Sequence, residues 1–291
     1  MIFFIADGKL GNQIFQYVFL KTIKKGNESL IAAGFDELKE VLELEHIIVL
    51  NTKSRLVKSF FFRIASPVFN FLSNKKFISS ISVKQEKVLE VFTRESTTYT
   101  KNKGILSYFT FIKLGFFQSE SFFQKDFAEK LMIKEKFLIQ ADELLNKVPL
   151  NSHKVFVHFR RGDYNDFTVY GKNTLLPIHY FKDQIDWFLK NRANSFFVFL
   201  SDEPKLVENE FGYLENKIIS SNNGFGTDMA IMTKCNSAIL SPSSFGWWGA
   251  YLMKNRDTVF APEFWLGFNS GCEFQGKCIA EFMTKVKVQS N

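Results

Sequence analysis

The sequence has few cysteines and no metal-binding pattern. Its three cysteines, Cys235, Cys272 and Cys278, are an odd number without a C-x-x-C pair, which argues against both a disulfide framework and a zinc site. The four histidines are scattered, and neither an H-E-x-x-H nor a D-x-D sequence supplies ligands for a divalent metal. We therefore expect a chemistry that uses no metal and no cofactor.

Long apolar runs are also missing. No run approaches the roughly 20 residues that a membrane-spanning helix needs, and residues 1–5 are too short and lack the basic start of a signal peptide. We therefore expect a cytoplasmic protein. Its 291 residues, 46% of them apolar, are enough for two domains with separate cores.

Acidic residues are scarce between Lys53 and Lys113, where twelve Lys or Arg face only three Glu. One interpretation is a solvated basic face. The other is peripheral contact with an anionic membrane, where each basic residue can contribute about 1 kcal/mol. The run Phe60–Phe62, flanked by Lys58 and Arg63, favours the membrane. Nucleic acid is not expected as a partner, because the stretch contains no recognition module.

The opening segment has the pattern of a strand, a glycine turn and a helix. Residues 1–6 are apolar, Gly8 and Gly11 follow, and the apolar spacing from Ile14 to Lys24 has a helical period. The rest of the first half predicts, in chain order, strands at 29–33 and 47–50, a mostly helical basic stretch at 51–96 and an amphipathic helix at 122–147. Pro149 ends that helix, so we place a domain boundary near residue 150.

The second half, 151–291, alternates strands with helices. Strands are predicted at 155–159, 195–200, 218–220, 237–240 and 259–261, and helices at 178–191, at 226–234 with Thr227 or Asp228 as the cap, and from Ser243 to Lys254. Such alternation predicts an α/β fold with a parallel sheet covered by helices on both faces.

Polar residues follow several of these strands, at the end where open α/β sheets bind ligands. Arg160 and Arg161 come directly after a buried strand, and arginine is suited to fork a pyrophosphate. Ser243 and Ser244 stand where a helix begins, which favours phosphate. Asp228 can accept the two N–H groups on one edge of guanine. Together these residues predict a nucleotide diphosphate site.

Four blocks carry a family resemblance: Gly8–Tyr17, His158–Tyr164, Asp228–Cys235 and Ser243–Leu252. In this order they resemble the α-1,2-fucosyltransferase family, in particular its bacterial members in glycosyltransferase family 11. The resemblance implies a GT-B fold, with an acceptor-side domain at 1–150 and a Rossmann-like GDP-sugar-binding domain at 151–291 facing it across a cleft. It also implies transfer from GDP-β-L-fucose, with inversion, to the 2-hydroxyl of a galactoside. Because the chain is basic and expected in the cytoplasm, we expect the acceptor to be a galactose-containing surface glycan or O-antigen.

The resemblance also implies residue roles. Arg160 would be catalytic and neutralise the leaving phosphate. The donor would further contact the residues His158, Arg161, Asp228, Ser243, Ser244 and Phe245. On the acceptor side of the cleft would lie Gly11, Asn12 and Gln13.

Two positions depart from the family pattern and two roles stay open. Lys9 replaces a glycine, which leaves the geometry of the first turn undecided, and Pro242 replaces an asparagine without removing the serine pair. For the general base that inversion needs, Asp163 is the first candidate and Asp202 the second. Alternatively, Asp163 forms an ion pair that orients an arginine.

Two other functions remain compatible with these residues. One is a fucosyltransferase of different linkage or acceptor, such as a protein O-fucosyltransferase. The other is a non-enzymatic anion-binding module that uses the basic region 53–113, which would bind in a salt-sensitive way.

Overall fold

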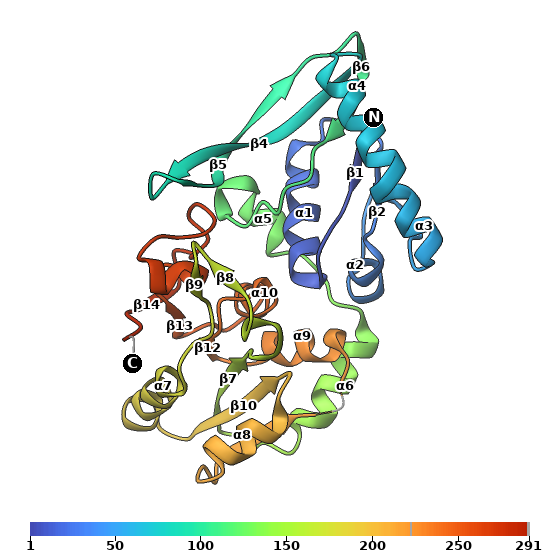
Figure 1. Ribbon diagram of the computed structural model, residues 1–291. Helices are drawn as coiled ribbons and strands as arrows, with labels where there is room; N and C mark the ends of the chain where they lie inside the picture. Colours follow the sequence, from blue (N-terminus) through green and yellow to red (C-terminus); the bar gives the residue numbers. More distant parts are fainter. Residues whose placement is uncertain (222, 290–291) are drawn as a thin grey trace. The chain divides into compact units, whose positions relative to one another are not determined.

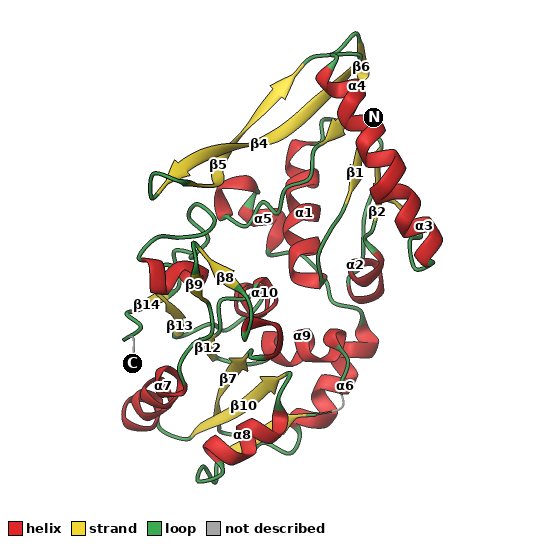
Figure 2. Ribbon diagram, in the orientation of Figure 1, coloured by secondary structure: helices red, strands yellow, loops and turns green. Residues whose placement is uncertain are grey.

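The computed structural model describes residues 1–221 and 223–289, and the chain forms two compact units (Figure 1). Unit 1 consists of Met1–Met132 with Gln275–Lys277, and unit 2 of Ile133–Phe274 with Cys278–Asn291. Both units are α/β (Figure 2).

The predicted boundary near residue 150 lies too late in the chain. Helix α6 (Glu135–Leu145) buries Phe137 and Ala141 and belongs to unit 2. Thr227 Oγ1 of α9 (Phe225–Thr233) donates to Gln140 Oε1 over 2.6 Å. The expected single helix at 122–147 is therefore two helices, α5 (Lys125–Ala128) in unit 1 and α6 in unit 2.

Unit 1 contains a six-stranded sheet in the order β3-β2-β1-β6-β4-β5. Its strands are β1 (Ile2–Ile5), β2 (Leu30–Ala33), β3 (Ile48–Leu50), β4 (Ile78–Val88), β5 (Phe92–Asn102) and β6 (Leu106–Ile112). All neighbours are parallel except β4 and β5. The helices are α1 (Leu10–Ile23), α2 (Asp36–Val41), α3 (Arg55–Phe60), a π-helical turn (Phe61–Ala65), α4 (Ser66–Asn74), a 3₁₀ turn (Glu120–Phe122) and α5.

The expected helical stretch at 51–96 is helical only as far as Asn74. The following residues form the antiparallel hairpin of β4 and β5. Its turn uses Leu89 and Glu90 at φ 48° and 62°, a conformation that normally favours Gly, Asn or Asp. Because neither residue is a usual turn former, no local pattern indicated this hairpin.

Unit 2 contains a parallel six-stranded sheet in the order β11-β10-β7-β12-β13-β14. Its strands are β7 (His153–Phe159), β10 (Ser195–Ser201), β11 (Lys217–Ser220), β12 (Ser237–Leu240), β13 (Val259–Pro262) and β14 (Thr284–Val286). Around it lie α6, α7 (Ile178–Asn191), α8 (Pro204–Phe211), α9, α10 (Ser244–Tyr251), the 3₁₀ turns Gly162–Tyr164 and Trp265–Ser270, and the small hairpin β8 (Thr168–Val169) and β9 (Lys172–Asn173). The predicted parallel α/β fold is confirmed, although β14, rather than the strand at 259–261, is the outermost strand.

The strand order of unit 2 decides where a ligand binds. Numbered by chain order within the sheet it is 3-2-1-4-5-6, the doubly wound Rossmann order. The order reverses between β7 and β12, so the connections leave these two strands in opposite directions. At such a reversal, open α/β sheets bind ligands beyond the carboxyl ends of the strands, where Arg160 and Ser241 follow in the sequence.

Candidate active site

Two hydrogen bonds join the ends of β7 and β12 at the point where the strand order reverses. Arg160 N donates to Ser241 Oγ over 3.0 Å, and Ser241 N donates to His158 O over 3.0 Å. Ser241 is fully buried. Its hydroxyl therefore fixes the backbone from which the Arg160 side chain departs.

The Arg160 guanidinium lies between two carboxylates. Its Nε and one Nη each approach Asp163 Oδ1 at 2.9 Å, and Nε lies 3.3 Å from Asp202 Oδ2. The Arg160 side chain is still 37% exposed. The two carboxylates thus hold the guanidinium in place and leave part of it accessible to an anion.

Arg161 is turned to a different environment. Its Nη1 donates to the Leu176 carbonyl, and its guanidinium carbon lies 5.5 Å from the centre of the Phe159 ring. Burial lowers its pKa below the usual arginine value. The two adjacent arginines therefore do not form a common fork, and Arg160 is the one placed for an anion at this edge.

Asp202, at the end of β10, organises both arginines. Its Oδ1 accepts from Arg161 N over 3.0 Å, while its Oδ2 faces Arg160. A Cβ atom at Gly162 would lie 2.5 Å from that Oδ2, so glycine is needed there for Asp202 to come this close. Asp163, the first candidate base, is 64% exposed and paired with Arg160. This contact is the one expected of a residue that orients Arg160.

His158 lies in β7 beneath α10. Burial, together with the nearby Arg160 charge, lowers the pKa of His158 to about 3, so the ring is neutral. A Cβ at Gly246 would lie 2.9 Å from ring atoms of His158, which shows how closely α10 approaches. The buried Nδ1 of His158 has no hydrogen-bond partner among the described residues.

The amino end of α10 follows β12 at the same edge of the sheet. Ser243 is its cap, and the Ser243 Oγ accepts from Phe245 N over 3.3 Å. Tyr164 donates its hydroxyl proton to the Pro242 carbonyl over 2.8 Å, which ties the arginine segment to the serine turn. Burial raises the pKa of Tyr164, so this hydroxyl stays a donor. Pro242 keeps the serine pair at the helix start, where the helix dipole favours an anion.

Asp228 lies in the first turn of α9, just beyond β11. Ser220 Oγ donates to its Oδ1 over 2.5 Å, and burial raises its pKa from 3.8 to about 6. The predicted cap role of Thr227 or Asp228 is wrong, because Gly224 is the cap residue. Since β10 lies between β11 and β7, the carboxyl ends of β11 and β7 are two strand spacings apart, which is about 10 Å.

In unit 1, the predicted acceptor-side residues lie in the first turn of α1. Gln13 is buried, and its amide donates to Gly8 O over 3.0 Å and accepts from Leu38 N over 2.9 Å. Asn12 Oδ1 accepts from Gln118 Nε2 over 2.7 Å, and Gly11 is buried. Gln13 therefore holds the turn together, and its role toward an acceptor stays a prediction.

The Lys9 departure from the family pattern is easily accommodated. Gly8, at φ 88°, makes the sharp turn, whereas Lys9 has an ordinary φ of −87°. The Lys9 side chain is 90% exposed and lies 3.5 Å from Glu37. The backbone of this turn thus needs no glycine at residue 9.

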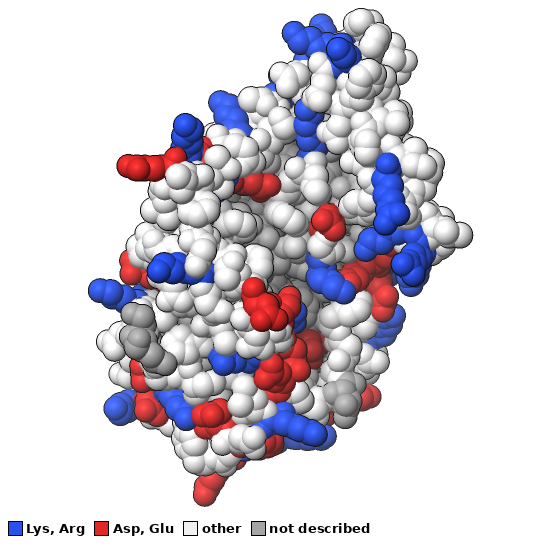
Figure 3. Space-filling view, in the orientation of Figure 1, with Lys and Arg blue, Asp and Glu red and all other residues white. Residues whose placement is uncertain are grey.

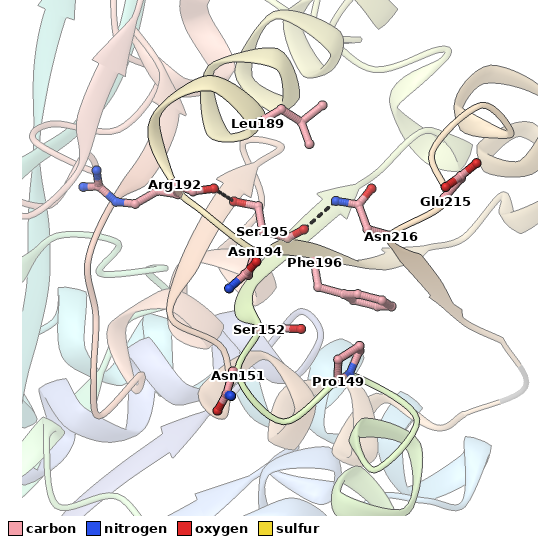
Figure 4. Close-up of a pocket in the computed structure, with 10 residues that line it drawn as sticks. All are labelled: Pro149, Asn151, Ser152, Leu189, Arg192, Asn194, Ser195, Phe196, Glu215 and Asn216. Atoms are coloured by element: carbon pink, nitrogen blue, oxygen red, sulfur yellow. Dashed lines mark hydrogen bonds between the residues drawn. The ribbon is translucent and has the colours of Figure 1, made fainter.

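A separate pocket lies at the opposite edge of the unit 2 sheet (Figure 4). It has a volume of about 500 Å³ and is lined at the amino ends of the strands by residues such as Ser152, Ser195 and Asn216. Ser195 Oγ donates to Arg192 O over 2.9 Å, and Asn216 Nδ2 donates to Ser195 O. These polar groups are occupied within the protein, so the pocket is not our candidate site.

The residues that sequence reasoning missed are Ser241, Ser220 and Gly162. The side chains of Ser241 and Ser220 position Arg160 and Asp228. The absence of a side chain at Gly162 leaves room for Asp202. Ser241 and Gly162 stand inside the recognised blocks or beside them, but nothing in the sequence distinguishes their role. Ser220 is separated from Asp228 by a loop, so only the fold shows their contact.

Comparison with known proteins decides the family. Residues 1–270 match the family described as Glycosyl transferase family 11. The chain belongs to glycosyltransferase family 11. The resemblance that the four motif blocks indicated is thereby confirmed, and an enzyme is favoured over a non-enzymatic anion-binding module.

Relatives in this family are similar over different lengths. An α-1,2-colitosyltransferase of Escherichia coli is 29% identical over 286 residues, covering 89% of this chain and 90% of the relative. The O-antigen biosynthesis glycosyltransferase WbnK of Escherichia coli is 30% identical over 125 residues, which is 41% of either chain. Galactoside α-(1,2)-fucosyltransferase 1 of Mus musculus is 32% identical over 117 residues, covering 38% of this chain and 31% of the relative.

Solved structures establish the fold class. The fucosyltransferase NodZ from Bradyrhizobium aligns with a TM-score of 0.52 at 10% identity, covering 88% of this chain and 94% of NodZ. A glycosyl transferase family 9 protein from Veillonella parvula also aligns with a TM-score of 0.52, at 15% identity, covering 98% of this chain and 85% of that one. The chain therefore has the predicted GT-B fold with two Rossmann-like units.

Proposed function

We propose that this glycosyltransferase moves L-fucose from GDP-β-L-fucose to the 2-hydroxyl of a terminal galactoside, with inversion at the transferred carbon. The observation that carries the proposal is the position of Arg160 at the reversal between β7 and β12, held by Asp163 and Asp202. The names of the relatives support the α-1,2 linkage.

The donor would lie along the carboxyl edge of the unit 2 sheet. Its pyrophosphate would contact Arg160 and the amino end of α10. Its guanine would reach Asp228, which lies beyond β11 at about the distance between a base and its diphosphate. The ionised Asp228 carboxylate can accept from both N–H groups on the guanine edge, a contact that adenine cannot reproduce.

The chemistry follows from the charge that develops on the leaving group. As the sugar–oxygen bond breaks, the sugar becomes cationic and the GDP phosphate gains negative charge. A guanidinium already fixed at that oxygen stabilises the transition state more than the ground state. Asp163 and Asp202 position this guanidinium, and the acceptor hydroxyl attacks from the opposite face and loses its proton to a base.

A second donor is favoured by one specific relative. The α-1,2-colitosyltransferase matches this chain along 89% of its length, and colitose is L-fucose without its 3-hydroxyl. Both sugars can leave from GDP by the same route, because the reacting carbon and the phosphates are unchanged. The choice between them depends on a contact to the 3-hydroxyl.

The test is a transfer assay on the purified full chain. GDP-fucose and GDP-colitose are each incubated with a panel of galactosides, with and without chelator, and the product linkage is determined by NMR. We expect an α-1,2-linked product that forms equally well with chelator. Absence of GDP release with every pair would overturn the enzyme proposal, a different linkage would overturn the α-1,2 assignment, and loss of activity with chelator would overturn the metal-free mechanism.

A further inference from the structure

Helix α3, the π-helical turn and α4 form one uninterrupted helical segment, residues 55–74, in unit 1. The backbone stays in the right-handed helical region at Phe60, Phe61, Ala65 and Ser66, where the three elements join. The π turn precedes Pro67, which lacks an N–H and crowds the carbonyl one turn earlier. The proline thus widens the helix without ending it.

The inner face of this segment packs against the hydrophobic core of unit 1. Ala65 is buried, and partly buried aromatic and aliphatic side chains pack with it against the unit 1 sheet. These side chains are Phe61, Phe62, Phe69 and Leu72, and they cover Phe3, Ile5, Ile78 and Phe111. One apolar face therefore has its partner.

The outer face is apolar as well. Five large apolar residues recur there at intervals of four, four, four and three, as one stripe along a helix requires. They are Leu56, Phe60, Ile64, Val68 and Phe71, and they are 50% to 82% exposed. We call these five residues the outer stripe. A surface helix normally carries polar residues in such positions, so the outer stripe is left uncovered by the part of the chain that the structure describes.

Along the chain, the charged residues that flank the outer stripe have one sign. No Asp or Glu occurs between Glu45 and Glu86. The basic residues are exposed and are Arg55, Lys58, Arg63, Lys75 and Lys76. Figure 3 shows basic side chains over α3 and beside the carboxyl end of α4, with acidic side chains close to those at the amino end of α3 in this view.

The adjoining loop extends the same surface. Ile105 N donates to Lys76 O over 2.9 Å, and Leu106 N donates to Phe77 O over 2.8 Å. Ile105 is 77% exposed, and Lys103 is exposed beside it. A cation and an apolar side chain thus stand together at the end of the segment too.

We propose that residues 55–74 bind the surface of an anionic lipid bilayer, with the helix lying in the plane of the interface. The outer stripe would enter the boundary between headgroups and acyl chains, and the flanking Lys and Arg would contact the lipid phosphates. The segment lies in unit 1, outside the candidate site, so this proposal does not depend on the proposed donor or acceptor.

Charge distinguishes a bilayer from a second copy of this chain. Two copies meeting through their outer stripes would bring basic residues against basic residues, which is unfavourable. An anionic bilayer supplies the opposite charge and an apolar interior at the same time. Within residues 1–221 and 223–289 no helix is long and apolar enough to cross a bilayer, so binding along the surface is the geometry that the segment allows.

Vesicle co-sedimentation of the full chain tests the proposal. We expect binding to vesicles of phosphatidylcholine with phosphatidylglycerol, weak binding to phosphatidylcholine alone, and a loss of binding as salt is raised. The triple variant Arg55→Gln, Lys58→Gln, Arg63→Gln should lose about fivefold in affinity for each charge removed. The triple variant Leu56→Gln, Phe60→Gln, Ile64→Gln should lose binding while glutamine keeps the helix.

Matched control variants lie on unit 2. They are the exposed apolar set Leu150→Gln, Leu189→Gln, Tyr213→Gln and the basic set Lys147→Gln, Lys190→Gln, Lys254→Gln. These should bind vesicles as the wild type does, and circular dichroism should be unchanged in all four. Equal binding by the segment variants and the controls overturns the proposal, as does no binding by the wild type. Concentration-dependent dimers that the segment variants abolish, without vesicle binding, overturn it in favour of a second copy.

Discussion

Arg160 differs from its neighbour Arg161 only through its surroundings. The Arg160 guanidinium contacts two carboxylates and stays partly exposed, whereas the Arg161 guanidinium contacts a backbone carbonyl and an aromatic ring. An anion that approaches the end of β7 therefore meets Arg160.

We expect Arg160→Ala to lower kcat by about 10²–10³-fold, the usual cost of removing one donor to a developing anion. The melting temperature should change little, because the side chain is partly exposed. Arg161→Ala is the contrasting variant and should act mainly on stability. Single-turnover kinetics and thermal melts separate the two. An Arg160→Ala enzyme with normal kcat would contradict the assignment.

The pH dependence of kcat can assign the roles of the two carboxylates beside Arg160. If Asp163 orients Arg160, as their 2.9 Å contact indicates, Asp163→Asn should lower kcat by a similar factor at every pH. A general base would instead give loss of the acid limb of the kcat profile. Asp202→Asn should show the same flat loss. A changed limb in either variant would identify that residue as the base.

In the proposed site, Asp228 would make nucleotide binding depend on pH. Burial raises its pKa to about 6 from 3.8, so ionisation costs more in the folded chain than in the unfolded one. The protonated Asp228 carboxyl contributes to the stability of the folded chain. This contribution is present in full below pH 3.8 and is lost as the pH rises through about 6. Asp228→Asn should therefore match the wild-type melting temperature near pH 4 and exceed it near pH 7.

GDP affinity supplies the complementary measurement for Asp228. Guanine needs the ionised carboxylate, so wild-type affinity should rise as the pH passes about 6. Asp228→Asn should bind weakly with no such rise. Ser220→Ala is a suitable second variant, because the Ser220 hydroxyl lowers the pKa of Asp228 and so favours its ionised form. A melting difference that does not vary with pH would contradict this account.

At the scale of elements, α10 is fixed by its close approach to β7. Its glycines and buried tryptophans leave little room for additional atoms. The helix start must sit against β7 for its N–H groups to face the same place as Arg160. The local sequence predicts a helix here, but only the packing shows why Gly246 stands in it.

We expect Gly246→Ala to destabilise the protein by about 1–3 kcal/mol, the range for overpacking a buried site. The new Cβ would lie 2.9 Å from the ring of His158, which is buried. Gly224→Ala has nothing within 4 Å of its Cβ and should cost much less. Urea unfolding measures both. Equal stabilities would show that α10 can move away from β7.

For the whole molecule, a nucleotide that binds only the folded chain should stabilise it. GDP at 100 times its dissociation constant should add about 2.7 kcal/mol, which corresponds to a rise of several degrees in melting temperature. ADP should give a smaller rise, because adenine cannot make the contacts proposed between guanine and Asp228. Asp228→Asn should remove the difference between GDP and ADP. Equal stabilisation by both nucleotides in the wild type would contradict a guanine site.

The elements of unit 2 were largely predictable because each has a strong local signal. Residues Val155–Phe159 of β7 are β-branched or aromatic apart from His158, and the strand ends before Gly162. Helix α7 begins after Pro177 and keeps a helical period. The hairpin of β4 and β5 was not predictable, since its turn contains Leu89 and Glu90 at positive φ. The membership of α6 in unit 2 was equally hidden, because an amphipathic pattern does not say which core covers it.

The sequence by itself determined the family, the alternation of strands and helices, and the residue types at the strand ends, because these depend on neighbours along the chain. Tertiary structure alone decided which arginine is available, since Asp202 reaches Arg160 from another strand. It also raised the pKa of Asp228 by burial and left the outer stripe exposed. These properties depend on contacts and solvent access between distant segments, which a linear pattern does not contain.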